Sequence, residues 1–245
     1  MRRLVQAAVW VALVCAAFPI DRWVYVEVAG SVAERTGEET WRFGRPSGGR
    51  STGLLELLHL LKRMGHLFFT ILIVVTMVLI APRRRRQAGV LLLAVGVTAA
   101  VGQGLLKPSI AKIRPDAELS AKEAEALVAR DGPDAVIVLP SKTRNFGSSY
   151  FRGPFSGFRD LSGLTLPSGH TALAFATFVV LAAAFPRARW WFLALACGVG
   201  ASRVLMGEHF VSDVVAGAGV GYACARALLA VPRIGRIMHV PPAPA

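Results

Sequence analysis

The chain has few cysteines and few acidic residues. Its three cysteines, Cys15, Cys197 and Cys224, all fall inside apolar runs, and none has Cys-x-x-Cys spacing. A free thiol in such a run behaves as a small hydrophobic side chain, so the sequence predicts neither a disulfide framework nor a thiolate metal site. The 15 acidic residues are outnumbered by 28 Lys and Arg residues, which gives a formal net charge of +13.

This positive charge is not accompanied by a recognisable nucleic-acid module, such as a zinc finger or a sheet with interleaved basic and aromatic residues. Hydrophobic residues make up 54% of the chain and gather in long blocks. That distribution indicates an integral membrane protein. We therefore expect the basic residues to meet anionic lipid head groups, and we expect no nucleic-acid partner.

Six apolar runs predict an all-α, polytopic membrane protein, with residues 1–245 forming a single domain. The first run is interpreted as an uncleaved membrane helix, because residues 16–19 make a poor signal-peptide cleavage site. A long polar segment separates the third run from the fourth. The expected spans are approximately 4–20, 66–81, 88–106, 171–185, 190–204 and 213–231.

The arginines predict how the chain is oriented. Residues 83–86 are four consecutive arginines in the turn between the second and third runs, and residues 186–189 and 233–236 are arginine-rich as well. Short, arginine-rich segments face the cytoplasm in most membrane proteins. The N- and C-termini are then also cytoplasmic, and the long polar segment is extracytoplasmic.

The polar stretches carry weaker signals. Residues 54–63 have an amphipathic rhythm and are expected to lie on the membrane surface. Residues 119–130, rich in Ala, Glu and Lys, predict a short helix, whereas 145–160, rich in Gly, Ser and aromatic residues, predict a loop.

Three polar clusters mark the predicted outer ends of the apolar runs. Lys107 and Arg114 follow the third run, and Arg203 lies between the fifth and sixth. If the third helix continues, Lys107 and Arg114 lie two turns apart and point into one site. With Arg203 they would surround a phosphate and the charge on its equatorial oxygens.

The second cluster, Pro167-Ser168-Gly169-His170, opens the fourth run. A helix N-terminus there, with the Ser168 hydroxyl group, would bind the equatorial oxygens of the phosphate. Gly169 would permit the backbone to approach the phosphate closely. His170 would then protonate the leaving oxygen.

The third cluster contains His209 and Asp213, four residues apart and on one face of a helix. The carboxylate would orient the imidazole, which attacks phosphorus and forms a phosphohistidine that water hydrolyses. The fixed cations would replace a metal ion, so we expect no metal and no cofactor.

Three spaced patterns carry a family resemblance. They are Lys107-x6-Arg114-Pro115, Pro167-Ser168-Gly169-His170 and Ser202-Arg203-x5-His209-x3-Asp213. In order and spacing they resemble the signature motifs of the type 2 phosphatidic acid phosphatase superfamily. The resemblance implies a six-helix membrane enzyme that dephosphorylates lipid phosphates from the extracytoplasmic face. With the Ala- and Arg-rich composition, it points to a bacterial inner membrane and a site facing the periplasm.

The substrate is left open between undecaprenyl diphosphate, phosphatidylglycerol phosphate, phosphatidate and the phosphates of lipid A. Two other classes are alternatives. One is a non-catalytic lipid carrier, or a phosphotransferase that passes phosphate to an acceptor other than water. The other is a vanadate-dependent haloperoxidase, which the six apolar runs disfavour.

Each cluster alone has a simpler interpretation. Lys107 and Arg114 would anchor a helix at the interface, and Ser168 would cap one. His59 and His66 flank an apolar run and are interpreted as interfacial. Three loop arginines could bind a second phosphate or a lipid head group but are interpreted first as solvated charge: Arg144, Arg152 and Arg159.

Overall fold

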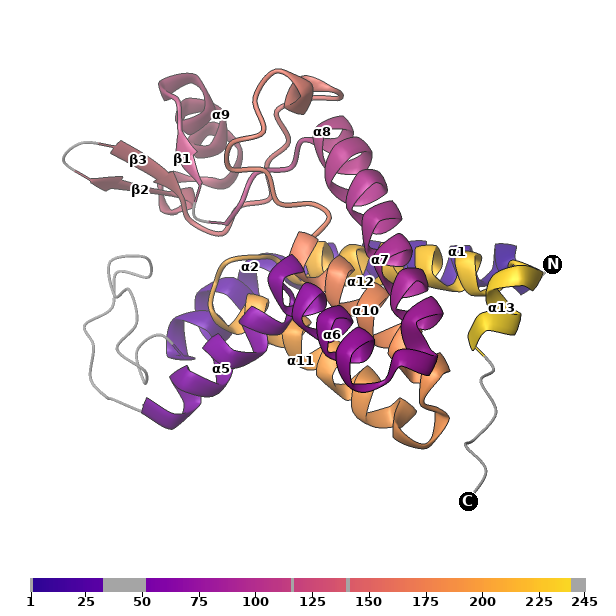
Figure 1. Cartoon of the computed structure of the whole chain (residues 1–245). Coiled ribbons are helices and arrows are strands. Elements are labelled where there is room, and N and C mark those ends of the chain that lie inside the picture. Colours follow the sequence, from indigo (N-terminus) through magenta and orange to yellow (C-terminus); the bar gives the residue numbers. More distant parts are fainter. Residues whose placement is uncertain (1, 33–51, 116, 140–141, 239–245) are drawn as a thin grey trace.

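The computed structural model describes residues 2–32, 52–115, 117–139 and 142–238. Within these ranges the chain forms a bundle of helices, with a smaller lobe built from the segment after α8 set against one end of it (Figure 1). The bundle helices are α1 (Arg2–Ala17), α2 (Asp21–Trp23), α5 (Thr52–Met64), α6 (Leu67–Ile80), α7 (Arg85–Ala99), α8 (Lys107–Ile110), α10 (Gly169–Ala184), α11 (Arg189–Leu205), α12 (Val211–Leu229) and α13 (Pro232–Met238).

Helix α10 forms the centre of the bundle. Its side chains pack between α7, α11 and α12, and Phe178, Val180 and Leu181 are all buried. Its 16 residues span about 24 Å at 1.5 Å per residue, less than the hydrocarbon core of a bilayer. An apolar helix enclosed by others in this way can be short because its ends are covered by protein.

Among the residues that the structure describes, two helical stretches, Val5–Val32 and Pro82–Ile110, are long and apolar enough to cross a membrane. The number rises to four if the bent pairs Gly53–Met64 with Leu67–Ile80 and Val211–Leu229 with Pro232–Met238 each count as one span. The mostly helical, apolar fold is therefore as expected, but the number of six spans remains a prediction.

The outer surface of the bundle is strongly apolar. Leu79 and Ile80 on α6 are 74% and 80% exposed, and Trp190 and Trp191 at the start of α11 are 69% and 73% exposed. Water would penalise such side chains, whereas lipid chains and the membrane interface favour them. These surfaces fit a membrane environment.

The first helix extends beyond the expected end at residue 20. A 3-10 turn (Phe18–Ile20), α2 and a π-helical stretch (Val24–Ala29) continue it, and Asp21 is buried in it. Of its charged side chains, Asp21 faces the protein and Glu27 is exposed. The glycine-rich part of the segment 21–65, residues 33–51, lies outside the described residues.

The third apolar run forms one continuous helical stretch with a change of winding before Pro108. Residues Ala100–Leu106 are π-helical, and Pro108 follows in α8. Proline has no N–H group and its ring crowds the carbonyl four residues earlier, so a wider turn accommodates it. The stretch ends at Ala111, which has the left-handed conformation with φ of 53°.

The smaller lobe contains a short antiparallel sheet, which the all-α prediction missed. Its strands are β1 (Glu118–Leu119), β2 (Val136–Leu139) and β3 (Lys142–Asn145), in the order β1-β3-β2. They were missed because two to four residues are too few to show a reliable alternation.

The helix expected at 119–130 is present as α9 (Ala121–Asp131). It begins with a capping box, in which Ser120 accepts from the Glu123 N–H and Glu123 accepts from the Ser120 N–H. The expected loop at 145–160 contains one short 3-10 turn, Ser156–Phe158.

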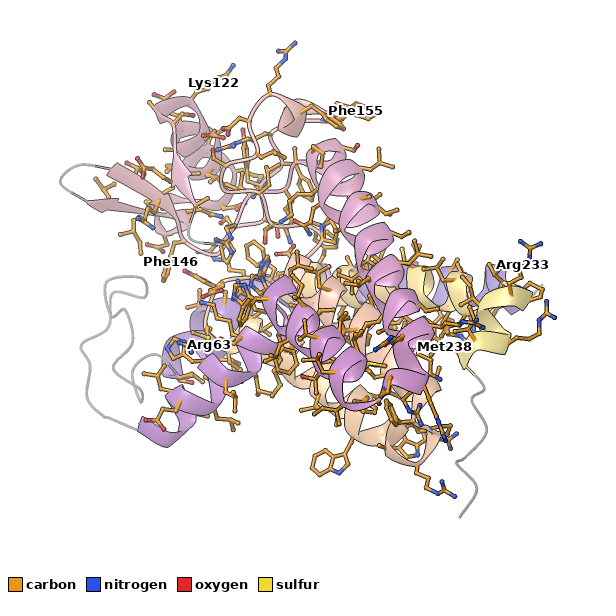
Figure 2. The ribbon with its side chains drawn as sticks, viewed as in Figure 1. Arg63, Lys122, Phe146, Phe155, Arg233 and Met238 are labelled. Atoms are coloured by element: carbon orange, nitrogen blue, oxygen red, sulfur yellow. The ribbon has the colours of Figure 1, made fainter. Side chains whose placement is uncertain are left out.

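The arginine-rich turns gather at one end of the bundle, as the topology prediction requires. The Arg84 guanidinium lies 4.3 Å from the centre of the Phe185 ring and donates to the Ala184 carbonyl, while Gln87 donates to the Met238 carbonyl of α13. The lobe with Lys122 and Phe155 lies at a distance from Arg233 and Met238 (Figure 2). The structure thus separates two ends, although which end faces the cytoplasm stays a prediction.

Candidate active site

The three polar clusters meet where the lobe contacts the bundle. The loop between α11 and α12 carries His209, and the segment before α10 supplies Ser168, whose N–H donates to the Asp213 carbonyl over 2.9 Å. The His209 N–H donates to the Arg203 carbonyl over 3.2 Å. Backbone hydrogen bonds therefore fix the second and third clusters against each other.

His209 and Asp213 are linked by a residue that sequence reasoning missed, Thr165. The Thr165 Oγ1 lies 2.7 Å from His209 Nδ1 and donates to Asp213 Oδ2 over 2.5 Å. His209 Nδ1 is itself 3.6 Å from that carboxylate oxygen. Because the single hydroxyl hydrogen goes to the carboxylate, the hydroxyl oxygen accepts from an Nδ1–H group. This tautomer leaves Nε2 without a hydrogen and able to act as a nucleophile.

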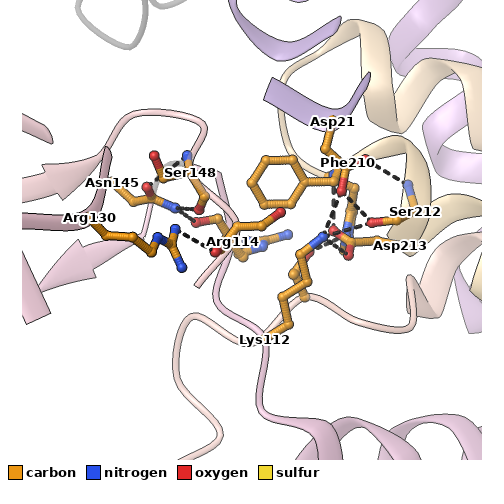
Figure 3. A network of polar contacts seen from close by, with 12 residues as sticks. Asp21, Lys112, Arg114, Arg130, Asn145, Ser148, Phe210, Ser212 and Asp213 are labelled. Carbon is orange, nitrogen blue, oxygen red and sulfur yellow. Dashed lines mark hydrogen bonds and ion pairs between the residues drawn. The ribbon is translucent and has the colours of Figure 1, made fainter. Parts of the chain in front are cut away.

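The other oxygen of Asp213 faces a buried lysine that was also missed. Lys112 Nζ lies 3.1 Å from Asp213 Oδ1 and 2.9 Å from Asp21 Oδ2, and all three side chains are at most 1% exposed. Lys112 also donates to the Ser212 hydroxyl group over 2.7 Å. Figure 3 shows these side chains converging from the first helix, the lobe and α12.

The lysine is enclosed by aromatic rings as well. Its Nζ atom lies 4.0 Å from the centre of the Phe210 ring and 4.6 Å from that of Phe18. A buried ammonium group needs such compensation, because leaving water costs it several kcal/mol. Lys112 thereby connects the first helix to the carboxylate that orients His209.

The cations Lys107, Arg114 and Arg203 all act electrostatically on His209. The expectation that a continuing helix aligns Lys107 with Arg114 was wrong. The helix ends at Ile110, and Lys112 and Ile113 form β-bridges to Phe151 and Leu164. Arg114 precedes a proline, which disfavours helical backbone, so an extended segment brings it to the site.

Ser168 is the N-cap of α10 and is fully buried. Its hydroxyl oxygen accepts from Thr171 over 3.0 Å, so its own hydrogen is still available. Gly169 begins the helix, and a Cβ atom there would lie 2.6 Å from Nε2 of Gln103, so a side chain at this position would displace the Gln103 amide. His170 Nε2 lies 3.2 Å from His66 Nε2.

Glu208, next to His209, contacts two cations. One carboxylate oxygen pairs with Lys62 of α5, and the other with Arg203. Burial would raise the pKa of Glu208, but the charges of Arg203 and Lys62 outweigh it, and the pKa lies below its usual value. The carboxylate is therefore ionised and holds Arg203 in place.

Burial lowers the pKa of the His209 imidazole well below its usual range, and the nearby charges of Arg203, Arg114 and Lys107 lower it further. Glu208 acts in the opposite direction but is a smaller influence. At neutral pH the ring is uncharged, which is the protonation state that a nucleophile requires.

Arg152 and Arg159 lie outside this arrangement. Arg152 pairs with Glu123 at 2.8 Å and with Asp160 at 3.0 Å, so it joins α9 to the loop. Arg159 is exposed. Among the residues that the structure describes, no three His, Cys, Asp or Glu side chains gather as a metal-ligand set; the expectation of metal-free chemistry remains a prediction.

A model of the PAP2 superfamily matches residues 88–235, more than half of the chain. The chain belongs to the PAP2 superfamily. The matched range begins in α7 and ends in α13, and it contains all three clusters. The family resemblance of the motifs is thereby confirmed.

Two curated PAP2 relatives match a shorter stretch. Both are named lipid A 1-phosphatase, one from Rhizobium johnstonii and one from Rhizobium etli, and each is 39% identical over 82 residues. The match covers 34% of this chain and about a third of each relative, 32% and 34%.

A solved structure shares the fold. It is described as the first transmembrane PAP2 type phosphatidylglycerolphosphate phosphatase from Bacillus subtilis. The superposition has a TM-score of 0.56 and covers 92% of both chains at 18% sequence identity. Agreement at this identity supports the membrane PAP2 fold as a whole.

Proposed function

We propose that this protein is a membrane lipid phosphatase that works through a phosphohistidine on His209. The observation that carries the proposal is the buried His209-Thr165-Asp213 chain, which leaves Nε2 unprotonated among three cations. The site lies at the lobe end of a bundle of apolar helices, which suits a substrate with a phosphate head and a lipid tail.

In the first step, His209 Nε2 attacks phosphorus, an N–P bond forms and the bond to the leaving oxygen breaks. His170 gives that oxygen a proton, and Thr165 and Asp213 hold the Nδ1–H of the ring, which becomes positively charged. In the second step, water attacks phosphorus, the N–P bond breaks and His170 regains a proton. Lys107, Arg114 and Arg203 stabilise the charge on the phosphoryl oxygens in both steps.

Lipid A carrying a 1-phosphate is the first substrate to test, because both curated relatives are named for that activity. Phosphatidylglycerol phosphate comes second, suggested by the neighbour of known structure. Undecaprenyl diphosphate and phosphatidate complete the panel.

The test is release of inorganic phosphate from these four lipids by detergent-solubilised protein. We expect release by the wild-type protein and loss of more than about 1,000-fold in H209A, since the nucleophile has no substitute. Chelator should leave the rate unchanged. If H209A keeps the wild-type rate, His209 is not the nucleophile. If a chelator inhibits the enzyme and a divalent ion reverses the inhibition, the metal-free mechanism is wrong.

Two further assays separate the alternative classes. A phosphotransferase would transfer labelled phosphate to a lipid acceptor and release little of it to water. A haloperoxidase would oxidise halide when vanadate is added and release no phosphate.

We further propose that the protein lies in a bacterial inner membrane, with its site facing the periplasm and both termini in the cytoplasm. Single cysteines at Lys122 of the lobe and at Arg187 of the α10–α11 turn test this in a background without the three native cysteines. A membrane-impermeant thiol reagent added to intact spheroplasts should label K122C and spare R187C. The reverse pattern would overturn the orientation.

A further inference from the structure

His66 contacts His170 from outside the three motifs. The Nε2 atoms of the two rings lie 3.2 Å apart, and the rings meet edge to face with their centres 4.4 Å apart. His66 is the N-cap of α6, at the corner where α5 and α6 bend by 69°. The proposed function assigns a role to His170 but none to its partner.

The chain at this corner is shaped to lie against His170. Gly65 is buried, and a Cβ atom at that position would lie 2.9 Å from both the Cβ and the carbonyl oxygen of His170. It would also lie 2.8 Å from Val199 Cγ1. Glycine is thus required for the corner to approach this closely.

The same corner reaches the site through a second side chain. Lys62, one helical turn before His66, pairs with Glu208, which in turn pairs with Arg203. Two independent contacts, one from Lys62 to Glu208 and one from His66 to the candidate acid His170, therefore dock the corner against the site.

The geometry of the histidine pair determines which nitrogen faces the substrate. Two Nε2 atoms at hydrogen-bonding distance share one hydrogen, so one ring donates and the other accepts. Because Nε2 of His170 faces His66, Nδ1 is the nitrogen left for the leaving oxygen. His66 itself is exposed and can exchange protons with water.

We propose that His66 is a positioning residue that relays a proton through His170 to the leaving oxygen, an inference that rests on the proposed function. As the bond from phosphorus to the leaving oxygen breaks, that oxygen takes the hydrogen from Nδ1 of His170. Nε2 of His170 simultaneously accepts a hydrogen from protonated His66, which becomes neutral. During hydrolysis of the phosphohistidine, water gives its proton to Nδ1 and the Nε2 hydrogen returns to His66.

The relay spares His170 a full positive charge inside the site. Lys62 of α5, Arg203 of α11 and His209 of the following loop all interact electrostatically with His170, and Glu208 lies between the two cations. In the relay the positive charge begins on the exposed ring of His66 and never accumulates on the inner ring.

The first test compares two leaving groups in H66A. A long-chain alkyl phosphate needs its leaving oxygen protonated, whereas p-nitrophenyl phosphate does not. We expect kcat on the alkyl phosphate to fall about 10- to 100-fold and kcat on the aryl phosphate to change less than about 3-fold. H59A, which removes another histidine, on α5, is the matched control and should keep both rates.

The second test asks whether His66 acts through His170. In an H170A background, the additional H66A change should cost no further activity on the alkyl phosphate. Added imidazole should restore part of the alkyl phosphate rate in H66A, because the vacated position is open to solvent. A role in folding alone would produce equal losses on both substrates and no rescue by imidazole.

The outcomes separate the two proposals. Wild-type protein that releases phosphate from neither of these substrates and from none of the four lipids overturns the proposed function and the relay with it. Active wild-type protein overturns the relay alone if H66A keeps its alkyl phosphate rate, loses both rates equally, or loses activity additively with H170A. The relay is established if H66A loses activity selectively on the alkyl phosphate, if H66A costs no further activity in the H170A background, and if imidazole rescues H66A.

Discussion

Thr165 lies between His209 and Asp213, with its hydroxyl oxygen 2.7 Å from the imidazole Nδ1 and 2.5 Å from the carboxylate. The imidazole and the carboxylate, four residues apart, are 3.6 Å from each other, too far for a hydrogen bond of ordinary length. The orientation of the proposed nucleophile therefore depends on a residue outside its own motif.

Replacing Thr165 with valine keeps the shape of the side chain and removes its hydroxyl group. We expect T165V to lower kcat about 10- to 100-fold, which corresponds to losing a hydrogen bond to a charged group. The KM should change little, because the hydroxyl group of Thr165 contacts His209 and Asp213. T165S restores the hydroxyl group and should recover most of the rate; equal losses in both variants would contradict the role of the hydroxyl.

Replacing Lys112 with methionine leaves two buried carboxylates, Asp21 and Asp213, without their shared cation. We expect K112M to destabilise the fold by about 3–5 kcal/mol, the usual effect of removing one partner of a buried ion pair. Denaturant or thermal unfolding in detergent measures this. Adding D21N should recover part of the loss, whereas K122M on the lobe surface should be neutral. Wild-type stability in K112M would show that the carboxylates do not depend on Lys112.

The pH dependence of activity should move when a neighbouring cation is removed. The protonated form of His209 cannot attack phosphorus, and the charge of Lys107 helps to lower the pKa of His209. K107M should therefore shift the acid limb of log kcat to higher pH relative to the wild type. Ionisation of the substrate is the same in both proteins and cancels in the comparison, once each profile is normalised to its plateau. An acid limb that stays at the same pH or moves to lower pH in K107M would contradict this electrostatic influence.

Close packing of α12 against the start of α10 is testable at Gly217. A Cβ atom there would lie 2.5 Å from the Ser168 carbonyl oxygen, so G217A must displace the backbone that precedes Gly169 and His170. We expect activity to fall at least about 10-fold, or stability by about 1–3 kcal/mol, the usual range for overpacking. Gly96 on α7 has open space beside it, so G96A should behave as the wild type. If G217A and G96A have the same activity and stability, the contact between α10 and α12 accommodates an added methyl group without cost.

Several features of the fold could be predicted because they repeat along the chain or are local. The apolar blocks identify α6, α7, α10, α11 and α12, since burial in protein or lipid requires many successive hydrophobic residues. The Ala-, Glu- and Lys-rich stretch predicts α9 for a similar reason, and Ser120 and Glu123 cap it locally. The arginine-rich turns predict which helix ends share a side, and Arg84 does contact the Phe185 turn.

Other features left no such signal. A single threonine, such as Thr165, is common in loops, and nothing nearby in the sequence distinguishes it. His66 looks like an ordinary interfacial residue until the bend between α5 and α6 brings it to His170. The path of Arg114 was predicted wrongly because a helix was extended through Ala111 and towards Pro115, where the backbone turns left-handed and then extends.

The sequence by itself determined which groups make up the candidate site: two histidines, an aspartate and three cations, in spaced motifs that mark the ends of apolar helices. Tertiary structure alone decided how these groups are held. Asp21 and Ser212 are 191 positions apart, and Lys112 joins them to Asp213 only when the first helix, the lobe and α12 pack together. A buried charge needs partners on every side, and those partners come from whichever segments the fold brings near, so no local pattern can reveal them.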